Sequence, residues 1–141
     1  MQIADAMTPN PRTVQPGDTL QTAAQLMDEL NVGVLPVTDG GRLVGMLTDR
    51  DIVIRSTSAG QDPRTATVAD AMTGEVRTLP VDASVLDAIR MMKEQQLRRV
   101  PVVDPVGQLV GILSLGDLAE AGTPEAADAL EAISTPAEPD R

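Results

Sequence analysis

The sequence predicts an α+β fold made of two similar lobes, and an internal repeat is the first observation that predicts it. Ile3-Ala-Asp-Ala-Met-Thr8 recurs 65 residues later as Val68-Ala-Asp-Ala-Met-Thr73. After a one-residue insertion in a turn, Leu43–Thr48 matches Leu109–Ser114. The second observation is that segments with helical spacing of apolar residues alternate with short apolar runs of strand length. We infer two copies of one folded unit.

Each lobe is expected to contain a short strand, a helix, two strands and a second helix. The repeat places lobe one at residues 1–58, a linker at 59–67 and lobe two at 68–122. An acidic tail follows at 123–141, where Thr123-Pro124 is typical of a cap and first-turn proline that open a short helix.

Polar residues mark where the helices of the two lobes begin. Asp18 is predicted to cap the first helix of lobe one, and Ser84 is predicted to cap residues 85–96. Thr48 and Ser114 are expected to open the second helix of each lobe. The strands are predicted at residues 34–38, 43–47, 99–103 and 109–113, with a hairpin turn at 39–41.

The composition excludes several classes of function. Among 141 residues there is no Cys, His, Phe, Tyr or Trp, and the net charge is −10. Disulfides, thiolate nucleophiles, histidine bases and aromatic stacking of bases are therefore absent. The negative charge repels nucleic acid and anionic membranes. With no signal peptide and no apolar run of about 20 residues, we expect a soluble cytoplasmic protein. A catalytic base would have to be Asp, Glu or the single lysine, Lys93, and no paired-acid arrangement is visible, so we expect that the protein is not an enzyme.

Two matched segments carry the chemistry that the composition leaves open. Gly45, Thr48 and Asp51 follow one another across a strand-to-helix junction, and Gly111, Ser114 and Asp117 repeat the pattern. Glycine allows a ligand to approach the strand backbone. The hydroxyl and the free N–H groups of the helix face an anion. The aspartate is placed to accept hydrogen bonds from vicinal ribose hydroxyls.

A ligand-free interpretation of the same residues stays open. Ser or Thr followed three residues later by an acidic residue is also the pattern of a capping box. Ser84 and Asp87 have this spacing without a preceding glycine, and we interpret them as a cap only. Asp49 and Asp51 diverge on a helix, so no metal site is expected.

The complete pattern resembles the CBS domain in its tandem form, the Bateman module, over residues 1–121. The resemblance is carried by Met7-Thr8 and Met72-Thr73, by Val34-Leu-Pro36-Val37 and Arg99-Val-Pro101-Val102, and by both Gly-x-x-Thr/Ser-x-x-Asp segments. It implies two lobes packed through their sheets with pseudo-two-fold symmetry and a ligand cleft between them. It implies ribose contacts from Asp51 and Asp117, and an adenine pocket lined by Thr13, Val14, Thr78 and Leu79.

The two lobes differ at the position that meets phosphate in related nucleotide-binding lobes. Lobe two has Arg98-Arg99 before its Pro101, where lobe one has Gly33-Val34. A guanidinium suits phosphate because its fork matches two oxygens. The alternative is that both arginines are solvated or paired with Glu94. Lobe one would draw instead on Arg50 or Arg55.

The predicted function is a regulatory module that binds an adenosine-containing ligand, namely AMP, ADP, ATP or S-adenosylmethionine. No cofactor is required, and the signal would pass to an unknown protein partner or through a homodimer. Apolar helix surface for that dimer is expected from Met91, Met92, Ile52 and Ile54. The competing prediction is a ligand-free dimeric interaction or scaffold protein.

Overall fold

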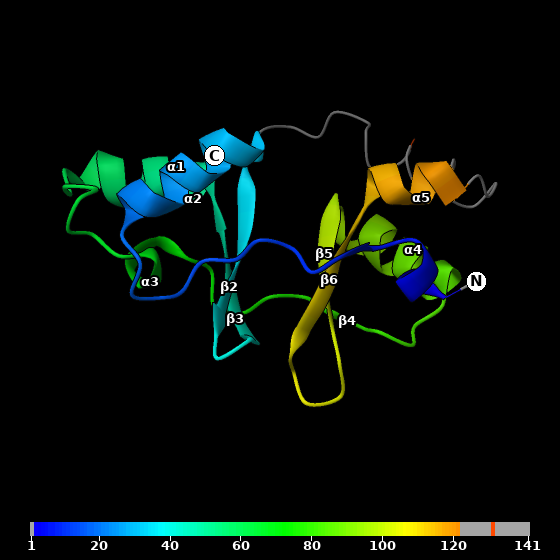
Figure 1. The fold of residues 1–141 in the computed structure, drawn as a ribbon. Coiled ribbons are helices and arrows are strands. Elements are labelled where there is room, and N and C mark those ends of the chain that lie inside the picture. The colour runs from blue at the N-terminus through cyan, green and yellow to red at the C-terminus, as the bar shows by residue number, and fades with distance from the viewer. Residues whose placement is uncertain (1, 122–130, 132–141) are drawn as a thin grey trace. The chain divides into compact units, whose positions relative to one another are not determined.

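The computed structural model describes residues 2–121 together with residue 131. These residues form two compact units, and each is described here by itself (Figure 1). The repeat-one unit consists of residues 11–76 and 107–109, and the repeat-two unit contains residues 2–10, 77–106 and 110–121. The helix predicted to start at Thr123-Pro124 lies outside the described residues.

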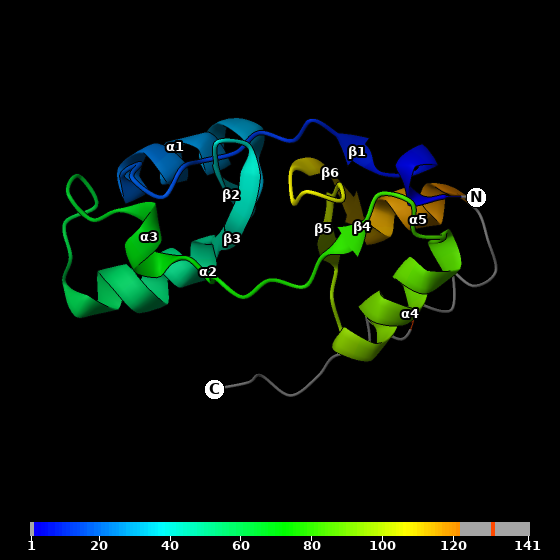
Figure 2. The same cartoon turned by 90° about the horizontal axis from the view of Figure 1, so that it is seen from below.

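The repeat-one unit is a helical layer on one face of a β-hairpin. Its elements are α1 (Leu20–Leu30), β2 (Val34–Asp39), β3 (Arg42–Thr48), α2 (Asp49–Asp51), the π-helical turn η2 (Ile52–Ser56), η3 (Thr57–Ala59) and α3 (Val68–Ala71). Figures 1 and 2 show the helices together on one side of the β2–β3 hairpin. The hairpin turn at Gly40 and Gly41 has positive φ angles of 61° and 84°, which glycine adopts without strain.

Apolar residues at helical and strand spacing meet in the core of this unit. Its fully buried members come from every layer, and they include Leu20, Ala23, Leu35, Val37, Leu47 and Val68. Val14 lies opposite Val37 in a parallel bridge, and Thr73 lies opposite Met46 in an antiparallel bridge. The hairpin therefore has a short neighbour along each edge.

The repeat-two unit contains the same succession of a helix, two strands and a second helix, and its sheet has four strands. Its elements are η1 (Ile3–Asp5), β1 (Thr8–Pro9), β4 (Leu79–Pro80), α4 (Val85–Gln95), β5 (Arg99–Val103), β6 (Leu109–Ser114) and α5 (Leu115–Ala121). The strand order is β1-β6-β5-β4, with β4 parallel to β5 and β1 antiparallel to β6. Figure 2 shows β1 beside β6, with α4 and α5 on one side of the sheet.

The register of the strands follows the sequence repeat. Leu79 pairs with Val102, and the equivalent residues Val14 and Val37 pair in the other unit. Thr8 pairs with Ile112, as Thr73 pairs with Met46. This agreement shows that the duplicated sequence specifies a duplicated sheet.

Each unit is completed by the opening segment of the other repeat. Met7-Thr8 starts repeat one but lies with β6 of repeat two, and Met72-Thr73 starts repeat two but lies with β3 of repeat one. The compact units therefore cross the boundaries drawn from the repeat. Sequence similarity identifies equivalent segments, whereas packing decides which strand each one completes.

Most of the expected elements are present, and one cap is displaced. The Thr19 hydroxyl, and not Asp18, accepts the bond from Thr22 N–H at the start of α1 (3.1 Å). The prediction of Asp18 is wrong by one residue because Asp18 accepts from Gln15 N–H in the preceding turn (2.8 Å). The Ser84 cap of α4 is confirmed. None of the described helices is long and apolar enough to cross a membrane.

Candidate functional site

The first candidate junction joins β3 to α2 in the repeat-one unit. Thr48 N–H donates to Asp51 Oδ2 at 3.0 Å, and Asp51 N–H donates to Thr48 Oγ1 at 3.0 Å. Both side chains are half-buried. Each side chain thus accepts a hydrogen bond from the backbone N–H of the other residue, which is a capping box at the start of the helix.

The second junction joins β6 to α5 and reproduces this geometry. Ser114 N–H donates to Asp117 Oδ2 at 2.9 Å, and Asp117 N–H donates to Ser114 Oγ at 3.1 Å. Asp117 is half-buried, like Asp51. The capping-box interpretation is therefore confirmed in both units, and binding of ribose by the two carboxylates stays a prediction.

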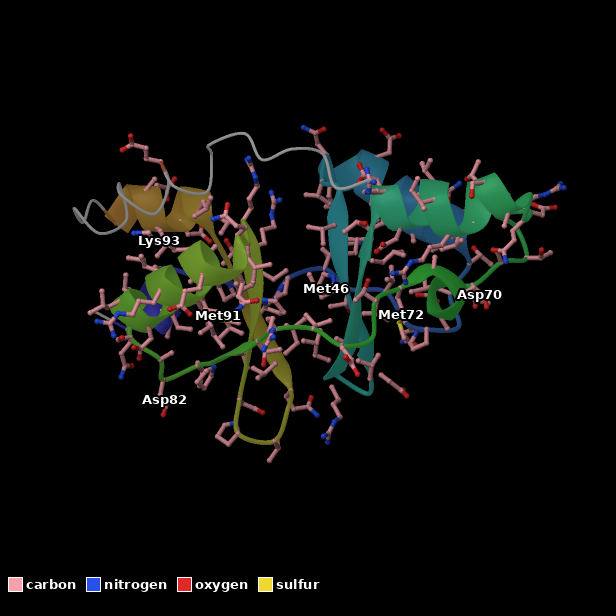
Figure 3. All side chains as sticks on the ribbon, turned by 180° about the vertical axis from the view of Figure 1, so that it is seen from behind. Met46, Asp70, Met72, Asp82, Met91 and Lys93 are labelled. Atoms are coloured by element: carbon pink, nitrogen blue, oxygen red, sulfur yellow. The ribbon has the colours of Figure 1, made fainter. Side chains whose placement is uncertain are left out.

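The glycines at these junctions have a close neighbour inside the protein. A β-carbon on Gly45 would lie 2.7 Å from the Thr73 carbonyl oxygen and 2.9 Å from the Met72 sulfur. Figure 3 places Met72 between α3 and the β2–β3 hairpin. A β-carbon on Gly111 would lie 2.5 Å from the Met7 sulfur and 3.0 Å from the Thr8 carbonyl oxygen.

Close packing of the exchanged Met-Thr segments therefore explains why both positions are glycine. From the sequence we expected these glycines to let a ligand approach the strand backbone. The repeat also indicated that a protein segment could fill this space, because both copies contain the Met-Thr pair as well as the glycine. A ligand contact at Gly45 and Gly111 stays a prediction.

The predicted adenine-pocket residues divide into core and accessible positions. Val14 and Leu79 are buried in the cores of their units. The backbone of Val14 is also engaged, since its N–H donates to Pro36 O (3.1 Å) and its carbonyl accepts from Thr38 N–H (2.9 Å). Thr13 is exposed and Thr78 is half-buried, so these two hydroxyls are the polar groups available there.

The residues around the central prolines differ in exposure between the units. Pro36 and Pro101 are buried, and Val34 is half-buried. Arg98 and Arg99 are both exposed. Within residues 2–121 no carboxylate forms an ion pair with either guanidinium, so the suggested pairing with Glu94 is not formed.

Gly33 and Arg98 occupy equivalent backbone positions in the two repeats. Asp49 N–H donates to Gly33 O at 2.9 Å, and Leu115 N–H donates to Arg98 O at 3.0 Å, so the backbones are equivalent. A β-carbon on Gly33 would lie 3.1 Å from Asp49 Oδ2. Repeat one therefore combines an acidic helix start with glycine, and repeat two combines an apolar start with arginine.

Arg55 has a role that the sequence analysis missed. Its Nη1 donates to the carbonyls of Met72 (3.0 Å) and Ala71 (3.4 Å), where α3 ends. A guanidinium at a helix C-terminus satisfies carbonyls that have no partner within the helix. Arg55 therefore makes a structural contact, and Arg50 is an exposed cation beside the first junction.

Two further expectations concern metals and apolar surface. Within the described part of the chain, no three carboxylates gather in a group that could hold a metal ion.

The expectation that Met92 offers surface for a dimer is wrong, because its side chain is fully buried in the core. Met91 and Ile52 are half-buried, and Ile54 is 42% exposed beside Val53 at 55%.

The candidate residues separate into one set in each unit. The repeat-one unit holds Thr13, Val14, Val34, Pro36, Gly45, Thr48 and Asp51. The repeat-two unit holds Thr78, Leu79, Arg98, Arg99, Pro101, Gly111, Ser114 and Asp117. Each set contains a hydroxyl–carboxylate junction, and only the second contains a pair of arginines.

Comparisons with known proteins agree with this duplicated arrangement. The chain is 46% identical over 117 residues to the CBS domain-containing protein YhcV of Bacillus subtilis, covering 83% of this chain and 82% of that protein. It is 42% identical over 116 residues to Hypoxic response protein 1 of Mycobacterium tuberculosis, covering 82% and 80%.

Two solved structures share the fold. The crystal structure of Hypoxic Response Protein I with two coordinated zinc ions has a TM-score of 0.77 at 40% identity, covering 85% of this chain and 98% of that one. The structure of CBSX2, an Arabidopsis thaliana protein, in complex with AMP has a TM-score of 0.76 at 32% identity, covering 86% and 95%. The family model described as CBS domain matches residues 3–57 and 68–123. The chain therefore belongs to the CBS domain family and carries a pair of CBS domains.

Proposed function

We propose that this CBS pair is a non-catalytic regulatory module that binds an adenosine-containing ligand, either an adenine nucleotide or S-adenosylmethionine. The observation that carries the proposal is the half-buried hydroxyl–carboxylate junction found at the same place in both units. Support also comes from CBSX2, a similar protein whose solved structure is a complex with AMP.

The roles of the residues follow from their chemistry. Asp51 and Asp117 use Oδ2 for the capping box, and their carboxylates would accept hydrogen bonds from the ribose hydroxyls with the remaining oxygen. Exposed Arg98 or Arg99 would bind phosphate oxygens, and only one of them is expected to do so because neighbouring residues of a strand face opposite ways. Because the repeat-one junction has acidic Asp49 beside it, we expect the set with the arginines to prefer the more highly phosphorylated ligand.

Calorimetric titration of Asp117→Asn with AMP tests the ribose role. Asparagine keeps the size and a capping oxygen but loses the charge, so affinity should fall by about 1.5–3 kcal/mol. Asp87→Asn is the matched control, because Asp87 is an exposed aspartate in the first turn of α4 near a serine cap. Unchanged affinity for Asp117→Asn with an intact fold would remove Asp117 from the site.

Replacing Arg98 and Arg99 by glutamine tests the phosphate role. The substitutions should abolish most of the preference for ATP over adenosine and leave adenosine binding intact. Added salt should weaken the same preference, since exposed charges are screened over about 8 Å at physiological ionic strength. Arg90→Gln, at an exposed position on α4, is the control for a general change in charge. Equal binding of adenosine and ATP to the unaltered protein would contradict the phosphate role.

The second candidate function is a ligand-free homodimeric interaction module. Two observations favour it: the capping boxes account for both aspartates without a ligand, and adjacent Val53 and Ile54 leave large apolar side chains exposed. Size-exclusion chromatography with light scattering tests it. Val53→Lys should produce monomers if this surface joins two copies, whereas Leu86→Lys, at an exposed apolar position on α4, should not.

A further inference from the structure

Met7 and Met72 occupy equivalent positions in the two repeats, and each packs its sulfur against a glycine-containing strand. The Met7 sulfur lies where a β-carbon of Gly111 would approach it to 2.5 Å, with the Met7 methyl group at 3.1 Å. The Met72 sulfur lies at the corresponding place beside Gly45 (2.9 Å). Each thioether thus fills the space that its glycine leaves open.

The two side chains remain partly accessible to solvent. Both are half-buried and pack at the margin of a core, whereas Met27 and Met92 lie inside the cores at 6% and 0% exposure. The chain has no Cys, His or aromatic residue to react in their place. Methionine is therefore the residue type through which this protein reacts with peroxides.

We propose that Met7 is an oxidation-sensitive modification site, and that its sulfoxide loosens residues 6–10 from the repeat-two unit. Hydrogen peroxide is the oxidant. The thioether sulfur donates an electron pair to one peroxide oxygen, the S–O bond forms, the O–O bond breaks and water leaves. The sulfur is oxidised by two electrons and the peroxide is reduced by two.

The sulfoxide cannot keep the position of the thioether. The sulfur rests against the Gly111 backbone, so an oxygen has no room on that side. The product is also polar, whereas Met7 packs against an apolar core. Relief comes when the side chain swings outward, and β1 loses a side-chain contact that supports its pairing with β6.

The two repeats should respond differently because their opening segments are held differently. Arg55 donates to the Met72 carbonyl at 3.0 Å. Backbone pairing does not distinguish the two segments, since Thr8 pairs with Ile112 as Thr73 pairs with Met46. The residue at the position equivalent to Arg55 in repeat two is Ala121, whose side chain has no hydrogen-bond donor. Oxidation of Met72 should therefore leave its segment in place, while oxidation of Met7 releases β1.

Peroxide treatment of the full chain tests the proposal. Trypsin distributes the methionines over the peptides 1–12, 13–42, 43–50, 65–77 and 91–93. Fragmentation then distinguishes Met1 from Met7 and Met91 from Met92. Hydrogen exchange then follows the amides of residues 6–10 and 72–76. We expect oxidation of Met7 to exceed that of Met92, severalfold faster exchange at residues 6–10, and unchanged exchange at 72–76.

Leucine variants assign the effect to one sulfur. Met7→Leu keeps an apolar side chain of similar volume and should abolish the response to peroxide, whereas Met72→Leu and Met91→Leu should retain it. In the unaltered chain, methionine sulfoxide reductase should restore protection, which provides a test that does not depend on how well Met7→Leu folds. The proposal is overturned if Met7→Leu still responds, or if Met7 is oxidised without faster exchange at residues 6–10.

Discussion

Substitution of the junction glycines by alanine tests the packing of the exchanged segments. At Gly45 the added β-carbon would lie 2.7 Å from the Thr73 carbonyl oxygen, well inside ordinary contact. That oxygen belongs to a residue held by two backbone bonds to Met46, so the backbone cannot move without stretching them. Overpacking of this kind costs about 1–3 kcal/mol.

The net effect is smaller because alanine also restricts the unfolded chain. The smaller conformational entropy of the unfolded chain stabilises the folded protein by about 0.4–1 kcal/mol. Gly45→Ala should therefore lower the free energy of unfolding by about 1–2 kcal/mol. At Gly111 the closest atom is the end of the Met7 side chain, and the Thr8 carbonyl oxygen lies at 3.0 Å. Because the Met7 side chain can rotate away, Gly111→Ala should be the milder change.

Urea unfolding followed by far-ultraviolet circular dichroism measures this difference, since the chain has no aromatic residue to report by fluorescence. Gly74→Ala is the matched control, because nothing lies within 4 Å of its β-carbon position and its φ is not in the left-handed region. It should be neutral or slightly stabilising. If Gly45→Ala is as stable as Gly74→Ala, the explanation of the glycines is wrong.

Three further predictions concern single contacts. Arg55→Gln should lower the free energy of unfolding by about 1 kcal/mol in urea titrations, because its bond to the Met72 carbonyl is lost. Thr19→Ala should cost about 1 kcal/mol in the same assay, because α1 loses its cap. Hydrogen bonds from the Arg64 side chain and backbone hold the pKa of Asp62 below its ordinary value of 3.8. This contribution to stability is present above that value and is lost as the pH falls through the lower folded pKa; carbon NMR of Asp62 in Arg64→Gln should show the pKa rising.

The architecture of each unit follows from local sequence signals. The helices begin at side chains that cap them, as at Ser84, and the pairing of Val14 with Val37 and of Leu79 with Val102 repeats with the sequence. The displaced cap at Thr19 reflects a competition between neighbours, since Asp18 is an equally good cap by residue type. Only the turn that occupies the Asp18 side chain decides between them.

The exchange of the opening segments could not be predicted in the same way. The repeat shows that Met7 and Met72 are equivalent. However, the strands that contain Gly45 and Gly111 are also equivalent, so the sequence does not indicate which Met-Thr segment packs on which strand. The bond from Arg55 to Met72 spans 17 residues, and the position equivalent to Arg55 in repeat two is Ala121, so no periodic signal reveals it.

The residues of the candidate site could be identified from the sequence, but the role of each residue could not. Asp51 and Asp117 were identified from spacing that serves both a capping box and a ribose contact, and the structure shows the first of these. Arg98 and Arg99 are exposed as a phosphate contact requires, although exposure alone does not identify a ligand.

Equilibrium dialysis against adenosine, AMP, ATP and S-adenosylmethionine tests the proposed function most directly. The protein contains no aromatic residue and is nearly transparent where adenine absorbs, so bound ligand is read as excess absorbance on the protein side. We predict a saturable excess for at least one of these ligands, reduced by Asp117→Asn and unaffected by Asp87→Asn. Equal absorbance on both sides at millimolar concentrations of all four would contradict the proposal and favour the ligand-free interaction module.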